Sequence, residues 1–184
     1  MITSALITGA NAGLGKECAR QLALQDGVEK VYLGCRNPER AAAAKAELEQ
    51  STGRSVFEVV ILDVSSVESC RSAAAGLPGP VDALVMNAGG MGGPTPAALT
   101  DEGVTHMFAI NVLGHVALAE ALLDSGKLTQ VAMYAGTEAA RGIKQMGMKR
   151  PDLKTSSANE FATIIDGTMF GTKTDPMTSY GPVK

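Results

Sequence analysis

The chain has few of the side chains that usually mark a substrate pocket or a secreted fold. It contains no tryptophan, two histidines, three tyrosines and three cysteines in 184 residues. So few aromatic and imidazole groups give no fingerprint of a pocket. The cysteines, Cys18, Cys35 and Cys70, are odd in number and follow neither a CxxC nor a metal-ligand spacing. No secretory signal precedes them, so we expect a reducing, cytoplasmic location and no metal site.

Strong charge and long apolar runs are also lacking. The formal net charge is −3, the sequence pI is about 5.4, and the basic residues are scattered along the chain. This balance gives no positive field to attract nucleic acid, so we expect a small-molecule partner. No apolar run approaches the roughly 20 residues that span a bilayer, which predicts no integral membrane segment.

The order of short apolar runs predicts the fold class. With 45% hydrophobic and 19% charged residues, the composition is that of a folded globular protein, and the length suits a single domain over residues 1–184. Short β-branched runs alternate with helical patterns, which is typical of an α/β fold with a Rossmann-like, doubly wound parallel sheet in three layers. The expected strands are residues 5–8, 30–36, 56–64, 82–90 and 130–136.

Helical patterns follow these strands. After the first strand, apolar side chains recur at helical spacing: Leu14, Cys18 and Leu22. Asn37, just before a proline, is typical of an N-cap, and residues 65–68 form a capping-box pattern that begins a third helix. The longest helical pattern covers about residues 101–124. These patterns supply the helices that a doubly wound sheet requires.

The sequence changes character after residue 137. It becomes polar, with one short apolar stretch at 161–165 and no clear pattern of secondary structure. A segment this long inside a compact domain is usually a functional loop, a lid or a partly disordered stretch. We interpret residues 138–179 as an insertion or lid-like segment, and a surface insertion without a role is the alternative.

The turn between the first strand and its helix is rich in glycine. Gly9, Gly13 and Gly15 follow Thr8 in the spacing TGxxxGxG. Such a turn lets the backbone approach a pyrophosphate, while the N–H groups and the dipole of the helix N-terminus point at the anion. A tight structural strand-to-helix turn also favours glycine, so this alternative stays open on the turn alone.

Five motifs in order resemble those of the short-chain dehydrogenase/reductase family, and the resemblance covers the whole chain. They are residues 8–15, Asp63-Val64, Asn87-Ala88-Gly89, Asn111 and Tyr180-x-x-x-Lys184. The resemblance implies a nicotinamide-dependent oxidoreductase, which transfers a hydride between its cofactor and the carbon of a carbonyl or alcohol substrate.

The family's cofactor site maps onto the first half of the chain. The resemblance implies that five residues surround the cofactor phosphates: Gly9, Asn11, Gly13, Leu14 and Gly15. It implies that Asp63 accepts a hydrogen bond from the adenine amino group, with Val64 beside it. Asn87, Ala88 and Gly89 would line the adenosine side and brace the sheet. For Asp63, a role as a cap at the end of its strand is the alternative.

The catalytic residues implied by the family lie in the second half. Tyr180 would be the general acid/base, and Lys184 would bind the nicotinamide ribose hydroxyls and lower the pKa of the Tyr180 phenol. Asn111 would hold a proton-relay water through its backbone in a locally bent helix, or else be a polar residue satisfied within that helix. Thr137 stands where the family has a serine, and its hydroxyl can bond a substrate carbonyl although its methyl group restricts χ1. An ordinary strand-end threonine is the alternative for Thr137.

The end of the second strand indicates which cofactor is bound. An acidic residue there would bind the 2′-hydroxyl of NAD. The sequence has Gly34-Cys35-Arg36 instead, so no carboxylate repels a 2′-phosphate and Arg36 can pair with it. We therefore predict NADP(H) rather than NAD, with Arg36 and the adjacent Asn37 in the cofactor site.

Within the family, residues 35–41 (CRNPERA) and the long interval before Tyr180 are most similar to the retinol dehydrogenases and the light-dependent protochlorophyllide reductase. That similarity implies a bulky apolar substrate. The sequence ends at Lys184, inside the helix that the family would continue, so we expect the last strands of the family fold to be missing. Two alternatives stay open: a non-catalytic NADP-binding or regulatory module, and an inactive truncated fragment of a dehydrogenase. A full-length form could be a homo-oligomer.

Overall fold

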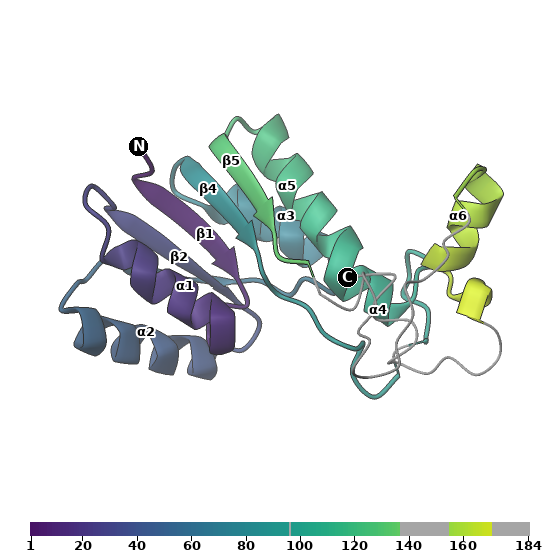
Figure 1. Cartoon of the computed structure of the whole chain (residues 1–184), viewed down its shortest axis with the longest axis horizontal. Helices are drawn as coiled ribbons and strands as arrows, with labels where there is room; N and C mark the ends of the chain where they lie inside the picture. The colour runs from purple at the N-terminus through teal and green to yellow at the C-terminus, as the bar shows by residue number, and fades with distance from the viewer. Residues whose placement is uncertain (96, 137–154, 171–184) are drawn as a thin grey trace, which may run out of the picture. The chain divides into compact units, whose positions relative to one another are not determined.

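The computed structural model describes residues 1–95, 97–136 and 155–170 (Figure 1). The chain divides into two compact units. Unit 1 comprises Met1–Ala88 and Gly114–Ala135, and unit 2 comprises Gly89–Leu113 and Gly136–Lys184. The organisation of residues 1–184 as a single domain stays a prediction.

Unit 1 is built on a five-stranded parallel sheet in the order β3-β2-β1-β4-β5. Its strands are β1 (Ser4–Thr8), β2 (Lys30–Cys35), β3 (Phe57–Ile61), β4 (Val81–Met86) and β5 (Leu128–Tyr134). This topology confirms the predicted α/β, Rossmann-like architecture. All five predicted strands are present with shifted ends. The largest shift is at β4, which stops four residues early because the backbone N–H of Asn87 turns to the Thr8 hydroxyl, 3.0 Å away, instead of continuing the ladder.

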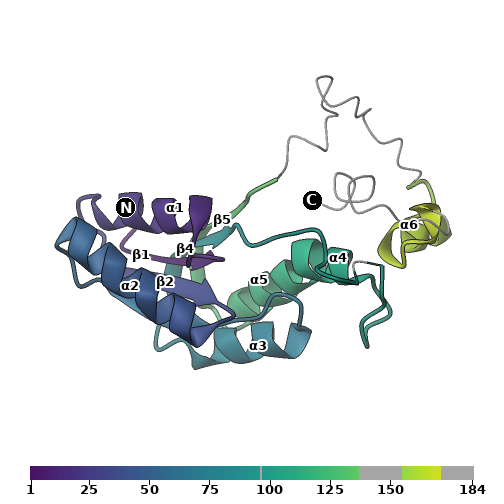
Figure 2. The same cartoon turned by 90° about the horizontal axis from the view of Figure 1, so that it is seen from below.

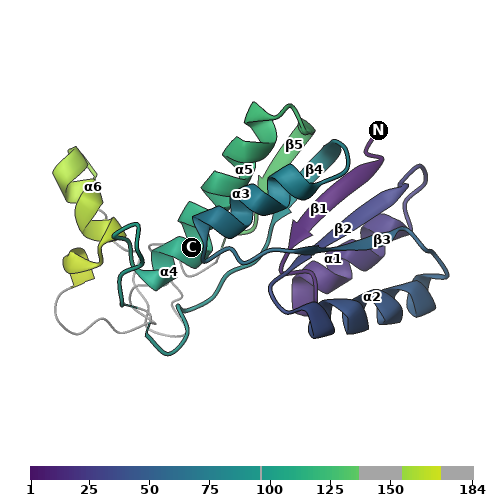
Figure 3. The ribbon, with the colours of Figure 1, turned by 180° about the vertical axis from the view of Figure 1, so that it is seen from behind.

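Alternating side chains of the central strands bury both faces of the sheet. Ile7 of β1 and Leu33 of β2 belong to the core beneath α1 (Gly13–Ala23) and α2 (Pro38–Thr52). Leu6 and Tyr32, one position away on the same strands, belong to the core beneath α3 (Val67–Gly76) and α5 (Gly114–Asp124). Figures 1 and 3 show the two helix pairs on opposite sides of the sheet, and α3 lies along α5 in Figures 2 and 3. Unit 1 therefore has three layers, as the alternating pattern of the sequence predicts.

Small residues line the buried face of α1. Leu14 is 82% exposed, whereas Gly15, Ala19 and Ala23 form the buried stripe. Small residues are required there because the helix begins very close to the β1 turn: a Cβ on Gly15 would lie 2.5 Å from the carbonyl oxygen of Gly9. Leu14, the first of the apolar residues that recur at helical spacing, therefore does not belong to this buried stripe, and its predicted place beside the cofactor phosphates stays a prediction.

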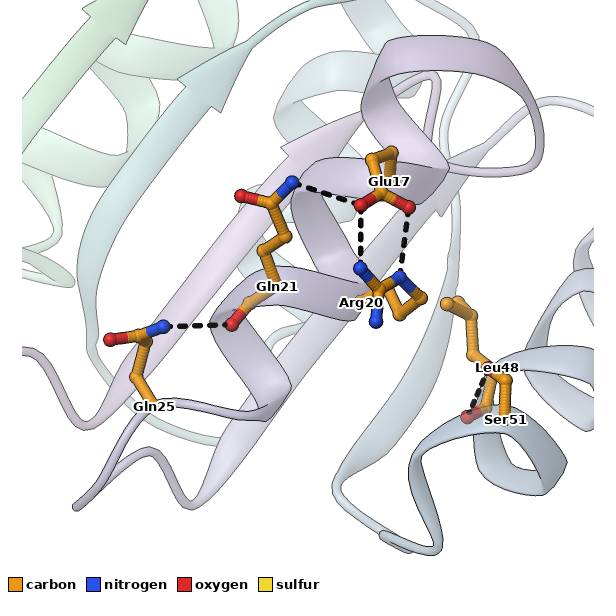
Figure 4. A network of polar contacts seen from close by, with 6 residues as sticks. All are labelled: Glu17, Arg20, Gln21, Gln25, Leu48 and Ser51. Atoms are coloured by element: carbon orange, nitrogen blue, oxygen red, sulfur yellow. Dashed lines mark hydrogen bonds and ion pairs between the residues drawn. The ribbon is translucent and has the colours of Figure 1, made fainter.

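The outer face of α1 carries a polar network (Figure 4). Arg20 donates two hydrogen bonds to the Glu17 carboxylate, at 2.9 and 2.7 Å, and the side-chain amide of Gln21 donates a third at 2.9 Å. The Arg20 hydrogen bonds, followed by the one from Gln21, lower the pKa of Glu17 to about 2. This face is a solvated surface, and pairs at i,i+3 and i,i+4 on an exposed helix face add little stability.

The helix N-caps test two further predictions. Asn37 caps α2 as predicted: its Oδ1 accepts a hydrogen bond from the backbone N–H of Arg40 at 2.7 Å. The capping box at residues 65–68 is displaced by one position, because Ser66 rather than Ser65 is the N-cap of α3 and accepts from the N–H of Ser69. The Ser65 hydroxyl is turned to Asp63 instead.

Unit 2 contains the start of the long helix. It begins at α4 (His106–Phe108) and not near residue 101, because Thr105 is its N-cap and accepts from the N–H of Phe108 at 3.2 Å. A π-helical turn, Ala109–Leu113, follows. The helix therefore departs from regular α-helical geometry at Asn111, and π-helical turns are frequent at functional sites. The predicted bend at Asn111 and its role as holder of a relay water stay predictions.

Part of the segment predicted to lack clear structure is helical. α6 (Ala158–Ile165) and the 3-10 turn Thr168–Phe170 lie within residues 138–179. Ile164 belongs to a small apolar core with residues of 104–109, and the N–H of Thr105 donates to the carbonyl of Ile165 at 3.0 Å. The interpretation of this segment as a lid-like insertion stays a prediction.

One helical stretch among the described residues, His106–Asp124, is long and apolar enough to cross a membrane, with a mean hydropathy of 1.5. Half of that window is buried, and core helices of soluble proteins meet the same criterion. A single such helix is weak support for a membrane span. The predictions of no membrane segment and of a cytoplasmic location stay predictions.

Candidate functional site

The glycine-rich turn joins β1 to α1 in the geometry that the motif predicts. Gly9 and Gly13 have φ values of 68° and 53°, in the left-handed region that favours glycine. The backbone N–H of Gly9 donates to the Gly34 carbonyl at 2.7 Å, which fixes the turn to the end of β2. Side chains at Gly9 and Gly15 would meet the Asn87 amide, at 3.2 and 2.5 Å respectively.

The N-terminus of α1 has no side-chain cap. Its N-cap residue is Ala12, and no acidic residue lies in its first turn. By contrast, the N-cap side chains of α2, α3, α4 and α6 each accept a backbone N–H: Asn37, Ser66, Thr105 and Ser157. The first N–H groups of a helix have no acceptor within the helix, and its dipole favours an anion. The α1 terminus can therefore accept a phosphate without displacing a cap.

Asn87 and Ala88 brace the glycine-rich turn from the end of β4. The Asn87 side-chain amide donates to the Thr8 carbonyl at 3.0 Å, and the backbone N–H of Ala88 donates to the Thr8 hydroxyl at 2.9 Å. A Cβ on Gly9 would lie 3.1 Å from the Cα of Ala88. The bracing of the sheet by Asn87 and Ala88 is thus present. Gly89 is the first residue of unit 2.

Arg36 and Asp63 lie together at the carboxyl end of β2 and β3. Arg36 is 75% exposed by its side chain, and its Nε is 4.0 Å from Oδ2 of Asp63. The other carboxylate oxygen of Asp63 accepts from the N–H of Ser65 at 2.9 Å and from its hydroxyl at 2.6 Å. Asp63 therefore does cap the turn after its strand through Oδ1, while Oδ2 faces Arg36. Asn37 is next to Arg36, and its Oδ1 is already the cap of α2.

The backbone of Val64, just after β3, lies very close to the start of α5. Its carbonyl oxygen would lie 1.9 Å from a Cβ placed on Gly114, the first residue of α5. Only a residue without a side chain allows this approach. The backbone after β3 and the start of α5 are thereby fixed against each other inside unit 1.

Asn111 lies in the π-helical turn of unit 2 and is fully buried. Its Nδ2 donates to the carbonyls of Gly90, at 2.7 Å, and Met107, at 2.8 Å, and its Oδ1 accepts from the N–H of Gly90 at 3.1 Å. The side chain therefore does what the alternative interpretation expects, satisfying polar groups near the helix. The predicted relay would use the backbone of Asn111, so the two roles are compatible.

The remaining predicted residues fall into two groups, those that the structure describes and those that it does not. Asn11 is half-buried and Leu14 exposed in the glycine-rich turn and first turn of α1. The predicted catalytic residues Thr137, Tyr180 and Lys184 lie outside the described residues. Asn111 is therefore the one predicted catalytic residue that lies among the described residues.

The cysteine thiols do not suit nucleophilic chemistry. All three are free. Burial raises the pKa of each thiol, and for Cys70 burial, together with the nearby charge of Asp63, raises it to about 12. Since the thiolate is the reactive form, these side chains are inert at neutral pH. Within residues 1–95, 97–136 and 155–170, no group of three His, Cys, Asp or Glu side chains could hold a metal ion.

A cavity of about 400 Å³ lies elsewhere in unit 1, between β3 and α3. Its lining includes Tyr32, Glu58 and Ile61 and none of the predicted site residues. We place the candidate site at the glycine-rich turn, because the uncapped N-terminus of α1 offers backbone N–H groups there and the Gly9 N–H ties the turn to the end of β2.

Two features were missed from the sequence. Ser157-x-x-Glu160 is a capping-box signature before an apolar run: Ser157 accepts from the N–H of Glu160 at 3.2 Å, and the Glu160 carboxylate accepts from the N–H of Ser156 at 3.0 Å. It could have predicted α6. His115, buried in α5 with its Nε2 2.9 Å from the Thr8 hydroxyl, has no local signature.

Comparisons with known proteins agree with the fold. Residues 3–142 match the short chain dehydrogenase family. Human retinol dehydrogenase 11 is 37% identical over 125 residues, which cover 66% of this chain and 38% of that protein. Short-chain dehydrogenase TIC 32 B, chloroplastic, from Brassica napus is 30% identical over 176 residues, or 94% of this chain and 50% of that protein. The chain thus spans half or less of these relatives.

Solved structures are also similar. An alcohol dehydrogenase from the archaeon Thermococcus sibiricus, complexed with 5-hydroxy-NADP, is 31% identical with a TM-score of 0.59, over 76% of this chain and 60% of that one. A 7α-hydroxysteroid dehydrogenase complexed with NADH has a TM-score of 0.64 over 98% of this chain and 59% of that one. At 23% identity, the second likeness shows the fold alone.

Proposed function

Because the chain belongs to the short-chain dehydrogenase family, we propose that it is an NADP(H)-dependent oxidoreductase acting on a carbonyl or alcohol substrate. The single observation that carries the proposal is the uncapped N-terminus of α1 directly after a glycine turn. A pyrophosphate bound there would receive hydrogen bonds from backbone N–H groups and the favourable end of the helix dipole.

The residues around this turn would divide the cofactor between them. Gly9, Asn11 and the first turn of α1 would contact the phosphates, and Asn87 and Ala88 would hold the turn in shape. Asp63 would accept from the adenine amino group through Oδ2, because Ser65 already occupies Oδ1. Arg36 would pair with a 2′-phosphate. These roles rest on the family motif together with the contacts described above.

The chemistry follows from the cofactor and from residues that the family motif names. Bound NADP(H) supplies or takes the hydride. Tyr180 would give a proton to the substrate oxygen or remove one, Lys184 would stabilise the phenolate, and Thr137 would orient the oxygen by a hydrogen bond. Asn111 would hold a water through its backbone, since its side chain is engaged with Gly90 and Met107.

We propose a bulky apolar substrate. Support comes from the relatives named retinol dehydrogenase, because retinol is a large apolar alcohol. The paucity of charged groups in α6, whose exposed face includes Phe161, is consistent with an apolar ligand.

Selectivity for NADP(H) is expected to depend on Arg36. A charge-assisted contact contributes about 1.5–3 kcal/mol, or roughly ten- to a hundredfold in affinity. Wild-type protein should bind NADPH more tightly than NADH by this factor, and Arg36→Ala should lose the preference without weakening NADH binding. Fluorescence titration of both cofactors measures this directly.

The control for that experiment is Arg71→Ala, which removes the same charge from an exposed position on α3. It should leave both affinities within about twofold, because Arg71 is not one of the residues of the proposed cofactor site and solvent screens the charge of an exposed side chain. Equal affinity of the wild type for NADH and NADPH would defeat the proposed selectivity.

A further inference from the structure

His115 is a buried titratable residue to which the proposed function gives no role. It lies in the first turn of α5, is 1% exposed, and its ring meets that of Tyr134 edge-on, with centroids 5.8 Å apart. Its Nε2 is 2.9 Å from the hydroxyl oxygen of Thr8. Thr8 is fully buried at the end of β1 and immediately precedes the glycine-rich turn.

The Thr8 hydroxyl has four polar neighbours within hydrogen-bond distance, and its single proton can be donated to only one of them. The backbone N–H of Ala88 donates to it at 2.9 Å, and the N–H of Asn87 donates to it at 3.0 Å while also reaching the Val85 carbonyl at 3.1 Å. A hydroxyl has two acceptor lone pairs and one proton. The two N–H groups occupy both lone pairs, so the Thr8 hydroxyl can interact with any further group only as a donor.

Two acceptors compete for that proton. The carbonyl oxygen of Val85 is 3.5 Å away, at the outer limit of a hydrogen bond, whereas His115 Nε2 is at the ordinary distance of 2.9 Å. The proton therefore belongs to the bond with His115, and Nε2 must accept it. An imidazole that accepts through Nε2 carries its own proton on Nδ1.

We propose that His115 is a positioning residue for the nucleotide site: as a neutral Nδ1–H tautomer it orders the Thr8 hydroxyl, which in turn holds the backbone of Asn87 and Ala88 against the glycine-rich turn. The role in cofactor binding rests on the proposed function. The tautomer does not, because it follows from the hydrogen bonds within unit 1.

The first test reads the tautomer. The chain has two histidines, His106 and His115, so long-range proton–nitrogen NMR spectra of histidine-labelled protein hold two ring systems, assigned by His106→Gln. At neutral pH, His115 should show an unprotonated Nε2 and a protonated Nδ1. A protonated Nε2, in either the other tautomer or the imidazolium, would overturn the inference.

The second test reads the consequence for NADPH binding. His115→Phe keeps the ring volume and removes the acceptor, and it should weaken binding by roughly three- to tenfold, the worth of one neutral hydrogen bond. His115→Gln offers an amide oxygen near the position of Nε2 and should restore affinity to within about twofold of wild type. Rescue by glutamine separates a hydrogen-bonding role from simple filling of the core.

A thermodynamic cycle with Thr8→Val completes the test. If His115 acts through Thr8, the Thr8→Val/His115→Phe double variant should bind NADPH no more weakly than Thr8→Val alone. Additive losses, or equal binding by the phenylalanine and glutamine variants, would overturn the positioning role. If wild-type protein binds no NADPH, the proposed function fails, and the tautomer measurement then decides the inference about Thr8 and His115 by itself.

Discussion

Gly114→Ala is expected to destabilise the protein strongly. The new Cβ would lie 1.9 Å from the Val64 carbonyl oxygen, 2.7 Å from its carbonyl carbon and 3.0 Å from its Cα. All three are backbone atoms, so no flexible side chain can move aside. Alanine gains about 0.5–1 kcal/mol over glycine inside a helix, but overpacking against backbone costs about 3 kcal/mol or more, and the clash wins.

Thermal unfolding followed by circular dichroism measures this effect. A loss of about 3 kcal/mol should lower Tm by roughly 6–12 °C in a chain of this size. Gly76→Ala is the matched control, because Gly76 ends α3 and its added Cβ would meet no atom within 4 Å. The control should be neutral or slightly stabilising. Equal Tm values for the two variants would show that α5 does not approach Val64 as described.

Gly15→Ala is expected to abolish most cofactor affinity. Its Cβ would lie 2.5 Å from both the Gly9 carbonyl oxygen and the Asn87 side-chain nitrogen. Relief of these contacts must move the glycine-rich turn or break the bond from Asn87 to Thr8, and either change removes donors from the phosphate position. Loss of one or two charge-assisted hydrogen bonds predicts roughly ten- to a hundredfold weaker NADPH binding.

Calorimetric titration of NADPH measures this loss. Gly79→Ala makes the same substitution before β4, with no atom within 4 Å of the new Cβ, and should bind as wild type does. Circular dichroism of both variants separates a local change at the turn from loss of the fold. An unchanged affinity in folded Gly15→Ala protein would mean that the turn does not hold the phosphates.

The sequence was sufficient to predict the features that depend on residues close together in the chain. The glycine turn, the Asn37 cap and the five strands each depend on neighbours within a few residues, and all are present. A local bend in the helix at Asn111 was implied by the family resemblance, whereas the π-helical turn itself was not predicted. The glycine turn and Asn111 are also positions of the family motifs, so both kinds of signal point to the candidate site.

Contacts across the sheet could not be predicted in this way. Leu14, Cys18 and Leu22 recur at helical spacing, yet Leu14 is exposed and the other two are only partly buried. The closeness of α1 to the β1 turn gives the fully buried positions to small residues, Gly15, Ala19 and Ala23. The same limit applies to Asp82 of β4, whose carboxylate accepts from the hydroxyl of Thr3, just before β1, at 2.8 Å and from that of Thr129 in β5 at 2.7 Å. Hydrogen bonds from Thr3 and Thr129 lower the pKa of Asp82.

The pairing of His115 with Thr8 shows the same limit inside the candidate site. The two residues are 107 positions apart, so neither spacing nor residue type announces their contact. The capping box at Ser157 was, by contrast, readable and was overlooked because the surrounding sequence is polar. The sequence therefore predicts the residues of the site that belong to a motif at the end of a strand, but not the contacts between residues far apart in the chain.

Steady-state oxidation of NADPH by the whole chain, with a panel of aldehydes and quinones and with Tyr180→Phe beside it, tests the central claim most directly. The account predicts carbonyl-dependent oxidation that falls by about a hundredfold or more in Tyr180→Phe, because general acid catalysis typically contributes that much. NADPH binding without any carbonyl-dependent oxidation, or turnover of Tyr180→Phe within a few-fold of wild type, would contradict it.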